Sequence, residues 1–354
     1  MTHRIALIGC GTVGIGFLKI LRDKGEHLRA RYGFEAKVVA VSDKVKGAVM
    51  ADGGLDLRAF VAHVESGKPI GEFDPKAVHG LDSVETIRRA KASIVVEVAW
   101  TDIKTGEPAA THIRESFKAG ANVVTTNKGP ATLFHGELTE LAKEHNVLWR
   151  HEGVVMSGTP VFDLLEFCLA GNDVKEIKGI LNGTTNFILT KMEDEGMAYK
   201  DALALAQKLG YAEADPTADV EGFDALAKIL VLSNIVLGAN LKTDQVARHG
   251  ISAITLEDIA KAKKDGKRYK LVASAKREGG KVVAQVEPVQ LPLSDPLAGV
   301  SGAMNAVTFT TDLSGPITIQ GPGAGQLETG FAVLIDALNI HRACQSKKHG
   351  RPGN

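Results

Sequence analysis

The 354-residue sequence has few of the features that mark specialised classes of protein. It has only three cysteines, Cys10, Cys168 and Cys344, which are far apart and form no C-x-x-C pair. A disulfide framework and a zinc site are therefore not expected, and a reducing cytoplasm fits this composition. The 42 basic side chains equal the 42 acidic ones, so no net charge favours binding to nucleic acid or to an anionic membrane.

The sequence also lacks an apolar run long enough to cross a bilayer. The nearest candidate, residues 229–237, has the length of a buried helix and is interrupted by Ser233 and Asn234. The N-terminus passes directly into a strand pattern, without the apolar core of a signal peptide. We therefore expect a cytoplasmic protein that binds neither nucleic acid nor membrane.

The length and the order of the expected elements indicate two domains of an α/β protein. A chain of 354 residues exceeds what one hydrophobic core usually serves. Residues 1–150 alternate buried strands with helices, which predicts a Rossmann-type doubly wound parallel sheet. Residues 151–320 combine helices with polar-alternating strands, which predicts an α+β domain whose open antiparallel sheet is covered by helices on one face. We expect a closing helix over 321–343, packed back on the first domain, and a disordered tail over 344–354.

A glycine-rich loop, G-x-G-x-x-G, follows the first expected strand and opens the first expected helix. Gly9 permits a tight turn, Gly11 lets a pyrophosphate approach the backbone, and Gly14 permits close packing of helix on strand. Thr12 and Val13 complete the loop, and the N–H groups of the helix start can bind phosphates. This context predicts dinucleotide binding.

The end of the second expected strand bears on the choice of cofactor. Asp43 is the candidate partner of the adenosine ribose hydroxyls, which favours NAD. Lys44 and Lys46 follow it and either hold a 2′-phosphate or belong to a solvated loop, the simpler interpretation. The sequence therefore leaves NAD or NADP open.

A lysine follows another buried strand at the edge where doubly wound sheets bind ligands. This residue, Lys128, ends the segment that contains Thr126 and Asn127. A lysine at this position either faces the reacting end of the cofactor or lies in a surface loop.

A second lysine, Lys228, follows a run of carboxylates. From Asp219 onward the pattern predicts one long buried helix, with Asp219 at its start and partly its N-cap. Asp224 and Lys228 lie one turn apart on the same helix face. Because buried charges are costly unless paired, the two form either an internal ion pair or part of a site. A carboxylate such as Glu213 or Asp219 suits the ammonium group of a zwitterionic substrate.

Taken together, these segments resemble the homoserine dehydrogenases over nearly the whole chain. The likeness is carried by Gly210-Tyr211, Asp215-Pro216, Asp219-Val220, Gly222, Asp224 and Lys228 in register, and by residues 9–14, 125–128, 182–186, 295–298 and 321–325. The resemblance implies reversible NAD(P)-dependent interconversion of L-homoserine and L-aspartate 4-semialdehyde, in the aspartate-derived pathway to threonine and methionine. It also implies a homodimer, with the second domain serving both substrate binding and dimerisation.

The resemblance further implies roles for individual residues. Lys128 and Lys228 correspond to the catalytic lysines, either of which can donate the proton to the alkoxide that forms. The substrate-binding residues implied are Gly183, Thr184, Tyr211, Glu213, Asp219 and Asp224. The cofactor-binding residues implied are Gly9, Gly11, Thr12, Val13, Gly14, Asp43, Thr126, Lys128 and Gly325.

A monovalent cation, Na⁺ or K⁺, is the other ligand that the resemblance implies. Its structural site corresponds to Glu152, Val155, Ser157 and Thr159, the alternative being a tight turn that binds nothing. Met156 and Ser157 replace glycines of the commoner version, and residues 99–107 also resemble a less usual branch of the family. The resemblance implies a short form without the C-terminal regulatory domain or a fused kinase.

Three alternatives remain beside this interpretation. A phosphorylating aldehyde dehydrogenase needs an activated cysteine, but Cys10 lies in the phosphate loop and Cys168 on an apolar helix, without a paired histidine. A nucleotide-binding sensor needs no chemistry, and the presence of both lysines with Glu213 and Asp219 argues against it. The third alternative is a related dehydrogenase of another small amino or hydroxy acid.

Overall fold

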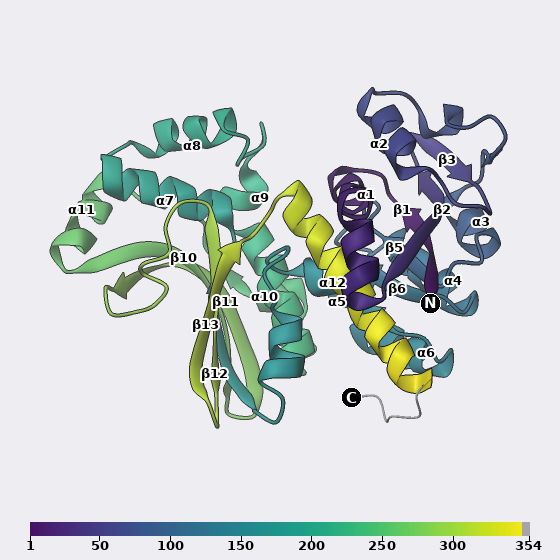
Figure 1. The fold of residues 1–354 in the computed structure, drawn as a ribbon. Coiled ribbons are helices and arrows are strands. Elements are labelled where there is room, and N and C mark those ends of the chain that lie inside the picture. Colours follow the sequence, from purple (N-terminus) through teal and green to yellow (C-terminus); the bar gives the residue numbers. More distant parts are fainter. Residues whose placement is uncertain (349–354) are drawn as a thin grey trace. The chain divides into compact units, whose positions relative to one another are not determined.

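The computed structural model describes residues 1–348, which form two compact units (Figure 1). The first unit comprises Met1–Gly158 and the segment from Gly325 onward, and the second comprises Thr159–Ala324. The last helix of the chain therefore belongs to the first unit, beside the N-terminal segments.

The first unit is built on a seven-stranded sheet with the order β4-β3-β2-β1-β5-β6-β7. The five strands β2, β1, β5, β6 and β7 are parallel, as a doubly wound sheet requires, whereas β3 and β4 add an antiparallel edge. The strands are β1 (Thr2–Ile8), β2 (Glu35–Asp43), β3 (Gly47–Met50), β4 (Val78–His79), β5 (Ile94–Glu97), β6 (Asn122–Thr125) and β7 (Trp149–Arg150). The predicted doubly wound architecture is confirmed, and the antiparallel edge is an addition to it.

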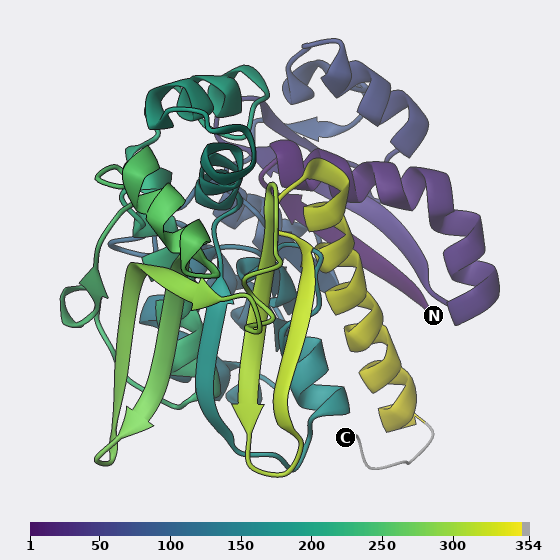
Figure 2. The same cartoon turned by 90° about the vertical axis from the view of Figure 1, so that its left-hand side faces the viewer.

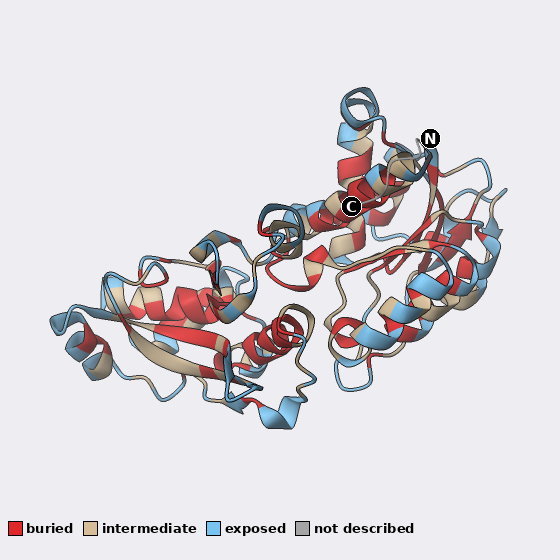
Figure 3. Ribbon diagram, turned by 90° about the horizontal axis from the view of Figure 1, so that it is seen from below, coloured by how far each residue is buried: buried red, intermediate tan, exposed pale blue. Residues whose placement is uncertain are grey.

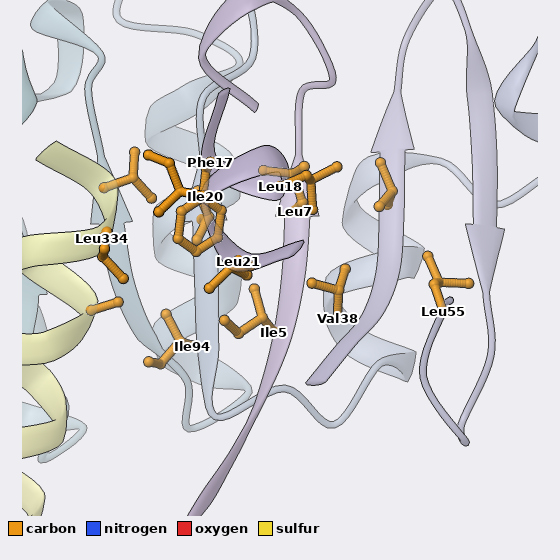
Figure 4. Packing of buried hydrophobic residues seen from close by; sticks show 14 of the residues in the cluster. Ile5, Leu7, Phe17, Leu18, Ile20, Leu21, Val38, Leu55, Ile94 and Leu334 are labelled. Atoms are coloured by element: carbon orange, nitrogen blue, oxygen red, sulfur yellow. The ribbon is translucent and has the colours of Figure 1, made fainter. Parts of the chain in front are cut away.

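Helices cover both faces of this sheet and enclose two apolar clusters (Figure 3). On one face, Phe17 and Leu18 from α1 pack over Leu7, with Leu334 of α12 beside them (Figure 4). On the other face, Phe117 of α4 belongs to the second cluster. The helices of the unit are α1 (Thr12–Tyr32), α2 (Leu57–Glu65), η1 (Ile70–Glu72), α3 (Ser83–Arg89), α4 (Ala109–Lys118), α5 (Lys128–Leu133), α6 (His135–Glu144), η2 (Glu152–Val154) and α12 (Gln326–Lys348).

The second unit contains a six-stranded sheet with the order β13-β12-β8-β10-β11-β9, antiparallel except for the short β9 beside β11. Figure 2 shows its main strands side by side. Helices α7, α10 and α11 pack on the sheet, and α8 lies on α7. The strands are β8 (Val174–Ile180), β9 (Ala247–Arg248), β10 (Lys267–Glu278), β11 (Lys281–Pro292), β12 (Met304–Thr311) and β13 (Gly315–Pro322), and the helices are η3 (Leu164–Cys168), α7 (Gly183–Glu195), α8 (Tyr199–Lys208), α9 (Thr217–Val220), α10 (Phe223–Val236), η4 (Thr243–Gln245) and α11 (Leu256–Lys264).

The helix predicted from Asp219 onward is in fact two helices. Asp219 lies inside the short α9, and Pro216 occupies the N-cap position of that helix. The Asp219 side chain therefore does not cap the long helix. Gly222 separates α9 from α10 with φ 79°, a left-handed conformation that glycine adopts without strain. The predicted buried character holds for α10, in which all residues from 225 to 233 are buried.

Two further boundaries differ from the prediction. The segment 160–169 contains the π-helical turn η3 instead of a regular helix, because Leu169 N–H donates to Leu164 O, five residues earlier. Its Cys168 is exposed. The last helix continues to Lys348, so residues 344–348 are helical where a disordered tail is predicted. The rest of the predicted tail lies outside the described residues.

Candidate functional site

The glycine-rich loop has the geometry that a bound dinucleotide needs. Gly9 has φ 97°, and a Cβ there would lie 2.5 Å from the backbone nitrogen of Ala99. A Cβ on Gly14 would lie 2.4 Å from the carbonyl oxygen of Gly9, so the loop closes only with glycine at both positions. Gly11, the N-cap residue of α1, has open space around its Cα, as a close approach of phosphate requires. Thr12 and Val13 begin α1, and the first N–H groups of a helix have no partner within the helix, so they can bind phosphate.

Asp43, at the end of β2, is tied to the glycine-rich loop. Its Oδ2 accepts a hydrogen bond from the Cys10 N–H at 2.8 Å, and its Oδ1 accepts from the N–H groups of Val45 and Lys46. Burial opposes ionisation of this carboxyl group, but the three backbone N–H groups outweigh it and lower the pKa of Asp43. The Lys46 ammonium donates to the Cys10 carbonyl at 2.6 Å. A negative charge is therefore fixed at the end of β2, where a ribose is expected.

Cys10 is unsuited to act as a nucleophile. Burial raises the pKa of its thiol to about 12, although Lys46 acts in the opposite direction. A thiol in this state carries almost no thiolate near neutral pH. The phosphorylating aldehyde dehydrogenase considered as an alternative would need an activated cysteine, and this one is not activated.

Lys128 is the first residue of α5, directly after the carboxyl end of β6. Thr126 lies between the two elements, and its side chain packs near Gly153. Asn127 precedes Lys128, and its amide donates to Glu97 Oε2 and to Ala99 O instead of capping α5. The backbone that carries Lys128 is thus fastened to the carboxyl end of β5.

In the second unit, Asn182 at the start of α7 joins charged groups of α9 and α10. Its Nδ2 donates to Asp219 Oδ1 at 2.7 Å and to Asp224 Oδ2 at 3.0 Å. Its Oδ1 accepts from the Thr185 N–H and caps α7. The Lys228 ammonium donates to Asp224 Oδ2 and to the Leu181 carbonyl, both at 2.7 Å. We call Asn182, Asp219, Asp224 and Lys228 the amide-carboxylate network.

The network keeps its charged groups only partly exposed. The side chain of Lys228 is 10% exposed and that of Asp224 is 22% exposed. Burial raises the pKa of Asp219; the hydrogen bond from Asn182 lowers it, and nearby Asp224 raises it further. A cation bound between the two carboxylates would favour their ionised forms, as the ammonium group of an amino acid does.

The other predicted substrate residues differ in how they contact α7. The hydroxyl of Thr184 donates to the Tyr211 carbonyl at 2.6 Å, and the Tyr211 ring lies 4.9 Å from that of Phe187, centroid to centroid. Gly183 is the first residue of α7. Glu213 is exposed, and its backbone carbonyl accepts a hydrogen bond from the Gln207 side chain.

The segment predicted to bind a cation is strained. Met156 and Ser157 both have left-handed conformations, with φ 59° and 54°. Glu152 is 1% exposed and its N–H donates to Asp336. The Ser157 hydroxyl lies 2.5 Å from that of Thr329, and Val155 is buried. Thr159 belongs to the second unit, where its hydroxyl donates to the Pro322 carbonyl. Gly325, predicted to bind cofactor, directly precedes α12.

Residues 1–348 lack two other kinds of feature. Over that part of the chain, no three or more His, Cys, Asp or Glu side chains are grouped to hold a metal ion. No helix described in it is long and apolar enough to cross a membrane.

Asn182 and Glu97 are the residues that the sequence interpretation missed. The signal for Asn182 is its place before a helix, where asparagine is a favoured N-cap. The signal for Glu97 is a carboxylate that ends an otherwise apolar strand, where it is fully buried.

A glycine-rich loop on a doubly wound sheet, together with paired carboxylates and a lysine in the second unit, is typical of an NAD(P)-dependent oxidoreductase that acts on a CH–OH group. Two family models match the chain: "Homoserine dehydrogenase, NAD binding domain" over residues 9–152 and "Homoserine dehydrogenase" over residues 160–338. The chain therefore belongs to the homoserine dehydrogenase family, as the sequence predicts.

Individual relatives agree with this assignment. The NAD(+)-dependent homoserine dehydrogenase of Pseudomonas canavaninivorans is 42% identical over 98% of each chain. The crystal structure of a homoserine dehydrogenase from Thiobacillus denitrificans is 33% identical with a TM-score of 0.84, covering 100% of this chain and 76% of that one. A hyperthermophilic archaeal homoserine dehydrogenase in complex with NADPH is 28% identical with a TM-score of 0.80, over 97% and 98% of the two chains.

Proposed function

We propose that this chain interconverts L-homoserine and L-aspartate 4-semialdehyde with NAD(P). The observation that carries the proposal is the amide-carboxylate network, in which Asn182 holds Asp219 and Asp224 close to the ammonium of Lys228. An amino acid substrate offers an ammonium group for such carboxylates and a hydroxyl group for a neighbouring lysine. Membership of the homoserine dehydrogenase family supports this choice of substrate.

The first unit supplies the cofactor site in this proposal. The N–H groups at the start of α1 bind the pyrophosphate, and the crowded contacts of Gly9 and Gly14 keep that loop closed. When bound, the cofactor accepts or returns a hydride at its nicotinamide ring. The residues of the chain orient the substrate and move the proton of its hydroxyl group.

The two lysines share the proton chemistry in this proposal. A lysine ammonium can stabilise the alkoxide that forms on the substrate and can donate a proton to it. Lys228 is oriented by Asp224 and by the Leu181 carbonyl, so we assign it a positioning and acid role. We assign Lys128, at the end of β6, the closer contact with the reacting oxygen.

Substrate recognition in this proposal involves the start of α7, the short helix α9 and the segment between α8 and α9. Asp219, with Glu213 from the neighbouring segment, binds the substrate ammonium group. Gly183 and Thr184 begin the 13-residue α7, and unpaired N–H groups at a helix start favour a carboxylate. Tyr211 is held beside them through Thr184.

Changing each lysine to methionine tests this division of roles. We expect Lys128→Met and Lys228→Met each to lower kcat at least about a hundredfold, because a general acid contributes that much or more. Melting temperature, measured in parallel, checks the fold. Lys143→Met is the control, because Lys143 is exposed on α6, where it forms an ion pair with Glu140. Near wild-type turnover in both variants would refute the assignment.

We propose NAD as the preferred cofactor. Support comes from the ionised Asp43 at the end of β2, whose charge repels a 2′-phosphate, and from Lys46, which is bonded to the Cys10 carbonyl. A relative is named as NAD(+)-dependent, whereas another was solved with NADPH, so family membership alone does not set the preference.

We also propose that Glu152 and the backbone carbonyls of Val155, Ser157 and Thr159 hold a structural Na⁺ or K⁺ ion. The support is the backbone of this turn. A left-handed conformation at a residue other than glycine, as at Met156 and Ser157, costs about 1–2 kcal/mol each. A bound cation would compensate this cost. The melting temperature should rise when KCl or NaCl replaces choline chloride, and Glu152→Gln should abolish the difference. Equal melting in all three salts would contradict the site.

Two finer proposals concern the whole protein. We propose a homodimer formed through the second unit, supported by the family resemblance and by the partly exposed alternate residues of the edge strand β13. Light scattering should give about twice the chain mass of 37.5 kDa, and the mass of a monomer would contradict the proposal.

We place the protein in the cytoplasm, supported by its three unbridged cysteines. A reporter fusion that is active only when exported would contradict that placement.

A further inference from the structure

Glu97 is a buried charge for which the chemistry above has no use. It is the last residue of β5 and is fully buried. Removing a carboxylate from water costs several kcal/mol unless hydrogen bonds and a counter-charge compensate it. A sheet of this kind needs no carboxylate at this position, so the contacts of Glu97 indicate what it does.

Both oxygens of Glu97 accept hydrogen bonds from the surrounding elements. Oε1 lies 3.2 Å from Nδ1 of His112 on α4 and 3.3 Å from the Ala99 N–H. Oε2 lies 2.5 Å from Nδ2 of Asn127 and 3.3 Å from the hydroxyl of Thr125. These partners come from α4, from the segment after β5 and from the carboxyl end of β6. One carboxylate therefore ties together three parts of the first unit.

The contact with Asn127 comes at a cost to α5. Asparagine at an N-cap usually accepts a hydrogen bond from its own helix, which is worth about 1 kcal/mol. Asn127 occupies the N-cap position of α5 but makes no such bond, because its amide is directed to Glu97 and Ala99. Lys128 is the next residue. The structure thus gives up a helix cap and fixes the backbone immediately before the lysine.

The contact with Ala99 reaches the glycine-rich loop. The Ala99 N–H donates a hydrogen bond to Glu97, and the same backbone lies against Gly9. A Cβ on Gly9 would lie 2.5 Å from the Ala99 nitrogen. The same carboxylate thereby sets the backbone beside the cofactor loop and the backbone that carries Lys128. These are the two parts of the first unit whose relative position matters for reaction.

We propose that Glu97, in hydrogen-bond contact with His112, is a positioning residue that acts through Asn127 on Lys128. This inference rests on the proposed role of Lys128. Glu97 does not touch the substrate: it holds the start of α5 so that the lysine ammonium meets the reacting oxygen. Its loss affects the chemical step more than the binding of homoserine, whose ammonium is recognised in the second unit.

The first test is Glu97→Gln, which keeps the shape but turns an acceptor oxygen into an NH₂ group that faces donors. We expect kcat to fall at least about tenfold and KM for homoserine to change less than about threefold, the pattern of an interaction needed in the transition state. His3→Gln is the control for the loss of a buried polar side chain, since His3 is also fully buried in the same unit, at the amino end of β1. It should leave kcat unchanged.

Asn127→Ser keeps the inference testable if Glu97→Gln does not fold. Serine restores a cap for α5, so stability should be maintained, but it cannot bridge to Glu97 and Ala99. We expect kcat to fall as it does in Glu97→Gln. A wild-type kcat in this folded variant, or in Glu97→Gln, would overturn the inference.

A double-mutant cycle separates this inference from the proposed role of Lys128. If Glu97 acts through Lys128, then Glu97→Gln should lower kcat in the wild type but change it less than about twofold in the Lys128→Met background. Fold-losses that multiply would mean that Glu97 acts independently and would overturn the inference, while the role of Lys128 stands. Full activity of Lys128→Met would instead refute the proposed role of Lys128 and the inference that rests on it.

Discussion

Asp43 is the residue that we propose sets cofactor choice through the contacts of its carboxylate. Three backbone N–H groups, those of Cys10, Val45 and Lys46, hold it ionised although burial acts against the charge. A ribose diol can donate hydrogen bonds to such a carboxylate, whereas a phosphate is repelled by it.

The variant Asp43→Asn removes this charge and keeps the shape of the side chain. We expect the ratio of kcat/KM for NADP to that for NAD to rise at least about tenfold, because one repulsive charge at contact distance is worth about 1–2 kcal/mol in a partly exposed site. Steady-state kinetics with both cofactors gives the ratio. Asp52→Ala is the control, since that carboxylate is paired with Arg4 at the surface. An unchanged ratio would mean that Asp43 does not contact the ribose.

The residues of the candidate site differ in how readily the sequence identifies them. Gly9, Gly11 and Gly14 lie within six consecutive residues, so the phosphate-binding loop can be recognised from the sequence alone. Asn182 is different, because its partners Asp219 and Asp224 lie 37 and 42 residues away. Only the packing of α7 against α9 and α10 brings these groups together, and no local pattern contains that information.

At the scale of elements, the break between α9 and α10 arranges the carboxylates. The left-handed Gly222 lets the chain turn between the two helices, so that Asp219 and Asp224 both face Asn182 at the start of α7. A continuous helix was expected from the apolar pattern. The apolar pattern predicts correctly which residues are buried, but it does not predict that one residue, Gly222, has a left-handed conformation.

Replacing Asn182 tests whether the network acts in recognition or only in stability. Asn182→Ala should lower the free energy of unfolding by about 1–2 kcal/mol through the lost cap. It should also lower kcat/KM for homoserine at least about tenfold, because Asp219 and Asp224 lose their shared donor. Asn182→Ser is the comparison: serine keeps a capping oxygen for α7 but cannot bridge both carboxylates, so kcat/KM should fall with less loss of stability. Loss of stability alone in Asn182→Ala would show a structural role only.

Strand β10 carries a buried lysine that makes stability depend on pH. Lys270 is 1% exposed, and its ammonium donates to the Asn186 side chain and to the Val300 carbonyl. Burial lowers the pKa of Lys270 from 10.5 to about 8. Between these two values the unfolded chain binds more protons at this residue than the folded chain, so the contribution of Lys270 to stability rises with pH.

The variant Lys270→Met isolates this contribution. The free energy of unfolding of the wild type minus that of the variant should increase from pH 8 to pH 10, and should be level below pH 7. Groups present in both proteins, such as Cys10, cancel in the difference. Chemical denaturation at several pH values measures it, with Lys267→Met, an exposed lysine on the same strand, as the control. A difference that is constant with pH would contradict the lowered pKa.

At the scale of the whole molecule, the division of labour between the two units follows from their chemistry. The first unit contains the phosphate-binding loop, and the second contains the amide-carboxylate network, so the proposed reaction needs both. Alternating strands and helices are enough to predict the doubly wound sheet of the first unit. The antiparallel edge strands β3 and β4 are too short for a periodic signal, and β4 has only two residues.

The most direct measurement is the rate at which the purified full chain reduces NAD⁺ and NADP⁺ with L-homoserine as the only substrate. The proposal predicts saturable, homoserine-dependent reduction that is faster with NAD⁺, and oxidation of NADH when L-aspartate 4-semialdehyde is supplied. L-Serine, which is shorter by one carbon, should react much more slowly. A folded protein that binds cofactor but shows no homoserine-dependent reduction of either one would contradict the proposal and favour a nucleotide-binding sensor.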